Sequence, residues 1–352
     1  MEYELTHGGD WAGFQAVYGQ TPLDFSANIS PLGMPEGVRA ALCQAAGQAD
    51  RYPDPLCREL RGALSEHEGV PAEWVLCGSG AADLIFRAVL ALRPGRALVT
   101  APTFAEYEAA LETVGCTVER YALRLEADFR IREDILEKIT PETDLLFLCE
   151  PNNPTGVTTP RPLLPRILER CRETGTYLVV DECFGDFLDE PEAHTLKGAL
   201  ADFPNLLILK AFTKLYGMAG VRLGYALCED AELLERMRRA GQPWGVSSLA
   251  QAAGLAALKE TGYVRQVRAL TAAERPWLAE QLERLGLQVV PGEANYLLFQ
   301  SETPLMEPLG QRGILLRCCG NYKGLDDTWY RAAVRTRAEN RRLIGALEEV
   351  LT

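Results

Sequence analysis

The chain of 352 residues has few of the residues that build metal sites. Only three histidines occur, His7, His67 and His194, and they lie far apart in the sequence. None of the ten cysteines forms a pair with the two-residue spacing of zinc sites, the nearest two being the adjacent Cys318 and Cys319. The cysteines stand in apolar runs, which is typical of buried free thiols in a reducing compartment. We therefore expect no metal site.

Excess positive charge and long hydrophobic runs are also missing. The formal net charge is −13, which repels nucleic acid and anionic membrane surfaces. The first five residues lack the basic start and apolar core of a signal peptide, and no apolar stretch is long enough to span a bilayer. We expect a cytoplasmic protein with a small-molecule partner. That partner can still be anionic, because a few converging arginines set the potential of a cleft.

Short apolar, β-branched runs alternate with stretches of helical periodicity up to about residue 227, which predicts an α/β fold with a mostly parallel sheet. The expected strands are 74–77, 97–100, 145–149, 177–180, 206–209 and 222–227. Later residues predict long charged helices and two further strands, as in a smaller α+β domain. We expect an arm at 1–39 that contributes to the small domain and the cleft, a large domain at 40–235 and a small C-terminal domain at 236–352.

Polar residues that follow the expected strands are the candidates for ligand binding, because ligands of open α/β sheets bind at the carboxyl ends of the strands. The turn Gly78–Ala81 opens a helix, whose free backbone N–H groups suit a phosphate. A dinucleotide-binding dehydrogenase requires a further glycine, but Asp83 stands at that position. The turn alone is a weak signal.

Three later segments extend the pattern: Asn152–Gly156, Asp181–Glu182 and Ala211–Lys214, with Arg222 eight residues beyond the lysine. An aldehyde cofactor with a pyridine ring requires a lysine for a Schiff base, a carboxylate at the ring nitrogen and a grip on its phosphate. Taken singly, these residues are also consistent with a surface lysine, a helix N-cap and an ordinary turn. Their order and spacing, taken together, predict a site for such a cofactor.

That order and spacing resemble the aspartate-aminotransferase superfamily, the fold type I enzymes that use pyridoxal 5'-phosphate. The resemblance implies the fold of these transferases, with the cofactor on Lys214. It further implies that Asp181 binds the ring nitrogen, Asn153 contacts the ring hydroxyl and Arg222 holds the cofactor phosphate. Phe104 falls where the family stacks an aromatic side chain on the ring. The resemblance adds three more cofactor-binding residues, Gly80, Ala81 and Thr213.

The segment Arg51–Pro55 is similar to a family segment whose tyrosine reaches the cofactor phosphate of a neighbouring subunit. Tyr52 therefore implies a homodimer with shared active sites. Two departures from the family pattern stand out. Ala211 replaces a hydroxyl residue that bonds the cofactor phosphate, so we expect one phosphate contact to be missing. Phe184 replaces a tyrosine that is common in aminotransferases, which bears on the reaction type.

Within the superfamily, the chain is most similar to the threonine-phosphate decarboxylases of cobalamin biosynthesis, with the histidinol-phosphate aminotransferases as the alternative. The residues behind this resemblance are His7–Gly9, Asp24–Asn28, Pro31–Gly33, Phe104–Tyr107, Phe184, Gln242–Trp244, Arg317, Asn321–Tyr322 and Tyr330–Arg331. The expected reaction turns L-threonine O-3-phosphate into (R)-1-amino-2-propanol O-2-phosphate and carbon dioxide. A regulatory module without turnover would require an additional domain, for which the chain leaves no residues.

The expected substrate carries a carboxylate and a phosphate, and both require cationic, directional partners. By resemblance, Arg331 binds the carboxylate. Arg317, His7 and Asn28 are then candidates for the substrate phosphate, with Arg335 as an addition. The orientation of the carboxylate would decide between loss of carbon dioxide and transamination.

Overall fold

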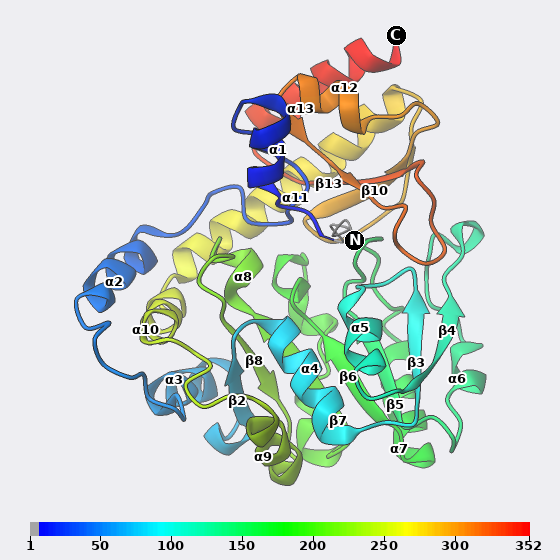
Figure 1. Ribbon diagram of the computed structural model, residues 1–352. Helices are drawn as coiled ribbons and strands as arrows, with labels where there is room; N and C mark the ends of the chain where they lie inside the picture. Colours follow the sequence, from blue (N-terminus) through cyan, green and yellow to red (C-terminus); the bar gives the residue numbers. More distant parts are fainter. Residues whose placement is uncertain (1–6) are drawn as a thin grey trace.

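A computed structural model describes residues 7–352 and contains a seven-stranded sheet in the order β2-β8-β7-β6-β5-β3-β4 (Figure 1). Its strands are β2 (Val75–Gly78), β3 (Arg96–Ala101), β4 (Thr117–Ala122), β5 (Leu145–Cys149), β6 (Tyr177–Asp181), β7 (Leu206–Ala211) and β8 (Gly224–Leu227). β8 runs antiparallel to β2 and β7, and the other neighbours are parallel. The predicted α/β class with a mostly parallel sheet is confirmed.

Helices cover both faces of this sheet, so its central strands are apolar on both sides. In β5, Leu145 and Phe147 belong to the core beneath α4, α5 and α9, whereas Leu146 and Leu148 pack on the opposite face with α7. The helices of these two layers are α4 (Ala81–Leu92), α5 (Glu106–Glu112), α6 (Ile135–Lys138), α7 (Leu163–Thr174) and α9 (Ala231–Ala240). Alternate side chains of one strand thus belong to two cores.

The last strand of the large sheet differs from its prediction at one end. The apolar pattern predicts a strand at 222–227, but β8 begins only at Gly224. Arg222 has a left-handed backbone, with φ 60°, which interrupts an extended strand. The turn directs the Arg222 side chain toward the loop before α4.

A second, antiparallel sheet lies in the C-terminal part in the order β12-β13-β10-β9. Its elements and the helices around it are β9 (Gln288–Val289), β10 (Tyr296–Gln300), β12 (Arg317–Cys318), β13 (Trp329–Ala333), α11 (Thr261–Arg284), α12 (Met306–Gln311) and α13 (Arg337–Leu351). The N-terminal residues join this part: α1 (Trp11–Tyr18) packs on α12, and β1 (Leu23–Asp24) pairs with β11 (Ile314–Leu315) (Figure 1).

The remaining helices are α2 (Glu36–Ala46), α3 (Arg58–Glu68), α8 (Phe212–Leu215) and α10 (Ser248–Ala257). α10 packs on α2 and α3 beside the large sheet. The domain boundaries at 39/40 and 235/236 stay a prediction. None of the helices in residues 7–352 is both long and apolar enough to cross a membrane.

Candidate active site

A cavity of about 190 Å³ lies at the carboxyl ends of the central strands of the large sheet, beneath the N-terminal arm and β13. Ten of the fourteen residues predicted for the site line it: His7, Asn28, Ala81, Phe104, Asn153, Asp181, Thr213, Lys214, Arg222 and Arg331. The lining residues of the large domain lie close together because the parallel strands that carry them end at one edge of the sheet. The arm and β13 supply the other wall.

Lys214 lies in the short helix α8, directly after β7, and its side chain faces the cavity. Its Nζ atom is 5.7 Å from the centre of the Phe184 ring. Burial, together with the nearby Arg331 and Arg222 guanidinium groups, lowers the pKa of Lys214 to about 8. The protonated form still predominates at pH 7, but a far larger share of this amine is unprotonated, and nucleophilic, than of an ordinary lysine.

Asp181 ends β6 and is buried. One carboxylate oxygen accepts from the Tyr107 hydroxyl at 2.8 Å, and the other accepts from the backbone N–H of Cys183 at 3.0 Å. Burial raises the pKa of Asp181, while these hydrogen bonds and Lys214 act in the opposite direction. A buried carboxylate held in this way suits a protonated ring nitrogen as its partner.

The anion-binding end of the cavity is formed by the start of α4 and by Arg222. Gly80 has φ 87°, and a Cβ atom there would lie 2.7 Å from Nη2 of Arg222. Gly80 does not line the cavity itself, but only glycine leaves space for that guanidinium. Arg222 donates to the carbonyls of Ala219 and Ser79, at 3.3 and 3.5 Å. With Lys214 and Asp181, this cradle fits pyridoxal phosphate.

Arg331, in β13, is buried above the cavity. Nη1 donates to Oδ1 of Asn153, and Nη2 donates to the Ser26 carbonyl at 2.8 Å. Within residues 7–352, its Nε atom and Oδ1 of Asn28 are buried without a hydrogen-bond partner. Both residues line the cavity, so each brings polar groups to it beyond those used within the protein.

His7 reaches the cavity from the arm and is held by a residue that the sequence did not suggest. Its Nε2 atom lies 2.6 Å from Oε1 of Glu106, and its ring centre lies 5.6 Å from that of Phe104. Glu106 belongs to the Phe104–Tyr107 motif, so the signal was present without an assigned role. Two further lining residues without a predicted role are Cys183 and Tyr322.

Arg317 and Arg335, predicted for the substrate, lie outside the lining of the cavity. Arg317 pairs across strands with Arg331, donates to Asn321 at 2.6 Å and lies 5.6 Å from the centre of the Tyr322 ring. Arg335 donates to the Asp24 carbonyl at 3.0 Å and to Glu339 at 2.7 Å. The roles of both arginines stay predictions.

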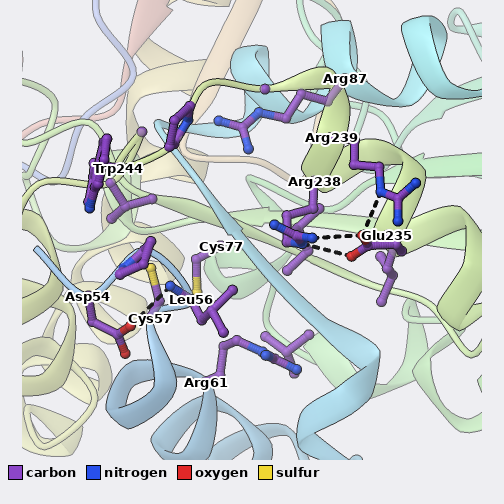
Figure 2. A pocket seen from close by; sticks show the side chains of 18 of the residues that line it. Asp54, Leu56, Cys57, Arg61, Cys77, Arg87, Glu235, Arg238, Arg239 and Trp244 are labelled. Carbon is purple, nitrogen blue, oxygen red and sulfur yellow. Dashed lines mark hydrogen bonds and ion pairs between the residues drawn. The ribbon is translucent and has the colours of Figure 1, made fainter.

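Tyr52 is the other predicted residue outside this lining. Its side chain is 81% exposed and packs on Trp244, with ring centres 4.6 Å apart. Trp244 lines a separate, larger cavity of about 780 Å³ between α3, β2 and α9. Figure 2 shows this cavity, with Cys57 and Cys77 on one side and Glu235 pairing with Arg238 and Arg239 on the other. Tyr52 is thus free to contact another molecule.

Residues 7–352 contain no group of three or more metal-ligating side chains placed to hold a metal ion.

A family model for aminotransferase class I and II matches residues 20–347. Threonine-phosphate decarboxylase of Salmonella typhimurium is 41% identical over an alignment covering 99% of this chain and 98% of that protein. Histidinol-phosphate aminotransferase of Symbiobacterium thermophilum is 39% identical, covering 92% of this chain and 89% of the relative.

Solved structures show the same likeness. The structure of histidinol-phosphate aminotransferase from Clostridium acetobutylicum matches with a TM-score of 0.87 at 26% identity, covering 94% of this chain and 99% of that one. L-threonine-O-3-phosphate decarboxylase from Porphyromonas gingivalis matches with a TM-score of 0.82 at 25% identity, covering 93% and 99% of the two chains. The predicted fold of the superfamily is confirmed.

Proposed function

The chain belongs to the aminotransferase class I and II family, whose cofactor is pyridoxal 5'-phosphate, and we propose that it decarboxylates L-threonine O-3-phosphate. The products are (R)-1-amino-2-propanol O-2-phosphate and carbon dioxide, a step of cobalamin biosynthesis. The observation that carries the proposal is the 41% identity to a threonine-phosphate decarboxylase over nearly the whole of both chains. That alignment also spans the N-terminal arm, which provides His7 and Asn28.

The cofactor, when bound, supplies a ring that accepts the electrons left on the α-carbon after a bond to it breaks. Lys214 provides the amine that holds the cofactor aldehyde. Asp181 would hold a proton at the ring nitrogen, and Phe104, which lines the same cavity, would pack on the ring. Arg222 and the α4 N-terminus, with Gly80, Ala81 and Thr213, surround the cofactor phosphate. These roles use the chemistry of each group at its observed place.

Substrate orientation is assigned to the polar side chains on the opposite wall of the cavity. Arg331 offers a planar guanidinium, anchored by Asn153 and Ser26, to the substrate carboxylate. His7 and Asn28 lie on the arm side of the same cavity, where the substrate phosphate would bind. The orientation in which these residues would hold the carboxylate against the bound cofactor would decide which bond to the α-carbon breaks. A displacement of about 1 Å changes this alignment.

Phe184 favours decarboxylation over the alternative, a histidinol-phosphate aminotransferase. Its ring lines the cavity beside Lys214 and packs edge-on against Tyr296. It has no hydroxyl to bind the cofactor or to assist a proton transfer. Transamination requires the α-proton to be removed and moved to the cofactor, whereas decarboxylation retains that proton and requires one proton to be delivered to the α-carbon in place of the carboxylate. The alternative retains support from the 39% identity to a histidinol-phosphate aminotransferase.

We further propose that the enzyme is a cytoplasmic homodimer in which Tyr52 contacts the cofactor phosphate of the neighbouring subunit. The exposed side chain of Tyr52 and its packing on the exposed Trp244 support a contact outside the subunit.

The deciding experiment incubates the cofactor-loaded protein with L-threonine O-3-phosphate and measures carbon dioxide and the amine product. Histidinol phosphate with 2-oxoglutarate is run in parallel, and glutamate is measured. Carbon dioxide together with 1-amino-2-propanol phosphate supports the decarboxylase. Glutamate from the parallel reaction, without carbon dioxide from the first, would make the enzyme an aminotransferase. Unphosphorylated L-threonine serves as the matched substrate that tests the requirement for a phosphate.

A further inference from the structure

Tyr107 connects the motif Phe104–Tyr107 to the centre of the candidate active site. It lies in the first turn of α5 and its side chain is fully buried. Its ring stacks on Phe147 of β5, with centres 4.8 Å apart and planes at 7°. Its hydroxyl donates to Oδ2 of Asp181 at 2.8 Å. The stacked ring therefore fixes the direction from which this hydrogen bond reaches the carboxylate.

The same ring supports a second predicted cofactor contact. Phe104 packs edge-on against Tyr107, with ring centres 5.7 Å apart and planes at 80°. On Asp181, the Tyr107 hydroxyl occupies Oδ2 and the Cys183 backbone N–H occupies Oδ1, so the carboxylate plane is held from both sides. A carboxylate held by two donors loses the freedom to rotate. Tyr107 thus positions both Asp181 and Phe104.

The hydrogen bond between Tyr107 and Asp181 also affects the pKa of both groups. Burial raises the pKa of Asp181, and the Tyr107 hydrogen bond lowers it, which favours the ionised carboxylate. Burial and the Asp181 charge raise the pKa of Tyr107, so its hydroxyl stays protonated and remains a donor. The other ionisable side chains that act on or respond to Asp181 are Lys214, Cys149, Cys183 and Tyr296.

We propose that Tyr107 is a positioning residue whose hydroxyl holds the Asp181 carboxylate in the orientation that meets the ring nitrogen of the bound cofactor. The inference rests on the proposed function, since it requires that pyridoxal phosphate bind in this cavity. It assigns to the tyrosine of the Phe104–Tyr107 motif a role in cofactor binding without direct contact with the cofactor.

The test replaces Tyr107 with phenylalanine, which preserves the stack on Phe147 and removes only the hydroxyl. We expect the dissociation constant of pyridoxal phosphate to rise about tenfold, because a hydrogen bond to a charged group is lost. We also expect kcat to fall with little change in KM. The midpoint pH of the absorbance titration of the bound cofactor should shift as well. The matched control is Tyr121→Phe, which also removes a hydroxyl bonded to a carboxylate, that of Asp134, but outside the cavity lining.

A double-mutant cycle separates positioning from a general effect on the fold. In the Asp181→Asn background, Tyr107→Phe should change the cofactor dissociation constant less than about twofold, because the charged partner is already absent. If Tyr107→Phe only lowers the melting temperature and leaves the cofactor absorbance, its titration and kcat unchanged, the positioning role is wrong. Equal losses in Tyr107→Phe and Tyr121→Phe would also overturn it. Failure of the unaltered protein to bind pyridoxal phosphate would instead refute the proposed function.

Discussion

Replacing Lys214 with methionine should abolish turnover and, in the cofactor-free protein, increase stability. Methionine preserves most of the side-chain volume but removes the amine. The lysine faces the cavity beside Arg331 and Arg222, and its pKa drops from the ordinary 10.5 to about 8. That drop corresponds to at most about 3 kcal/mol of cost for holding the charged amine in the folded state. The variant does not carry this cost.

The sign of the effect depends on pH. Below pH 8 the lysine is protonated in the folded and the unfolded states, so the full cost is present. Between pH 8 and pH 10.5 the folded state releases its proton first, the unaltered protein gains stability, and the advantage of Lys214→Met declines toward zero. Stability at active sites is commonly reduced in this way for the sake of function.

The assay is urea denaturation of both cofactor-free proteins at pH 7 and at pH 10.5, with the difference in the free energy of unfolding compared at each pH. Lys138→Met is the control, because Lys138 is 54% exposed and forms a surface ion pair with Glu119 across 3.5 Å. It should change stability by less than about 0.5 kcal/mol at both pH values. The reasoning would be refuted if Lys214→Met were no more stable than the unaltered protein at pH 7. It would also be refuted if the variant exceeded the unaltered protein in the free energy of unfolding by the same amount at both pH values.

Three further outcomes are expected. Ala211→Ser should lower the dissociation constant of pyridoxal phosphate by about tenfold through an added hydrogen bond to the phosphate, and an unchanged constant in a fluorescence titration would contradict this. Arg331→Lys should lower kcat/KM for L-threonine O-3-phosphate by about tenfold or more, because a lysine cannot replace the planar fork; steady-state kinetics with full activity would show that the carboxylate binds elsewhere. The rate at which the cofactor-free protein attaches pyridoxal phosphate covalently should rise with pH and level off above about 8, as the Lys214 amine loses its proton; a stopped-flow absorbance profile that is flat from pH 6.5 to 9 would contradict the lowered pKa.

The meeting of Asp181 and Lys214 at one edge of the sheet could be predicted, because local sequence and strand order determine it. Asp181 ends β6, and Lys214 follows β7, its parallel neighbour in the sheet. Polar residues at the ends of adjacent parallel strands meet at one edge whatever the rest of the chain does. The sequence did not predict the left-handed turn at Arg222, because an apolar run indicates the position of a strand better than the residue at which it begins.

The substrate side could be predicted only by resemblance. Arg331 and Arg335 are both close to the end of β13, yet Arg331 is buried over the cavity and Arg335 donates to the Asp24 carbonyl and Glu339. Nothing in their local sequence separates them. The difference arises because Arg331 lies within β13, whereas Arg335 follows the strand and directly precedes Thr336, the N-cap of α13, whose first turn supplies Glu339.

The sequence by itself therefore determined the α/β class and the likeness to the aminotransferase class I and II family, because these depend on periodicity and on motifs of residues near one another along the chain. Only the tertiary structure decided which distant groups meet: Arg331 with Asn153, His7 with Glu106, and Tyr107 with Asp181, separated by 178, 99 and 74 positions. Such contacts depend on how the arm and the C-terminal sheet pack over the large sheet, and no local pattern encodes that packing.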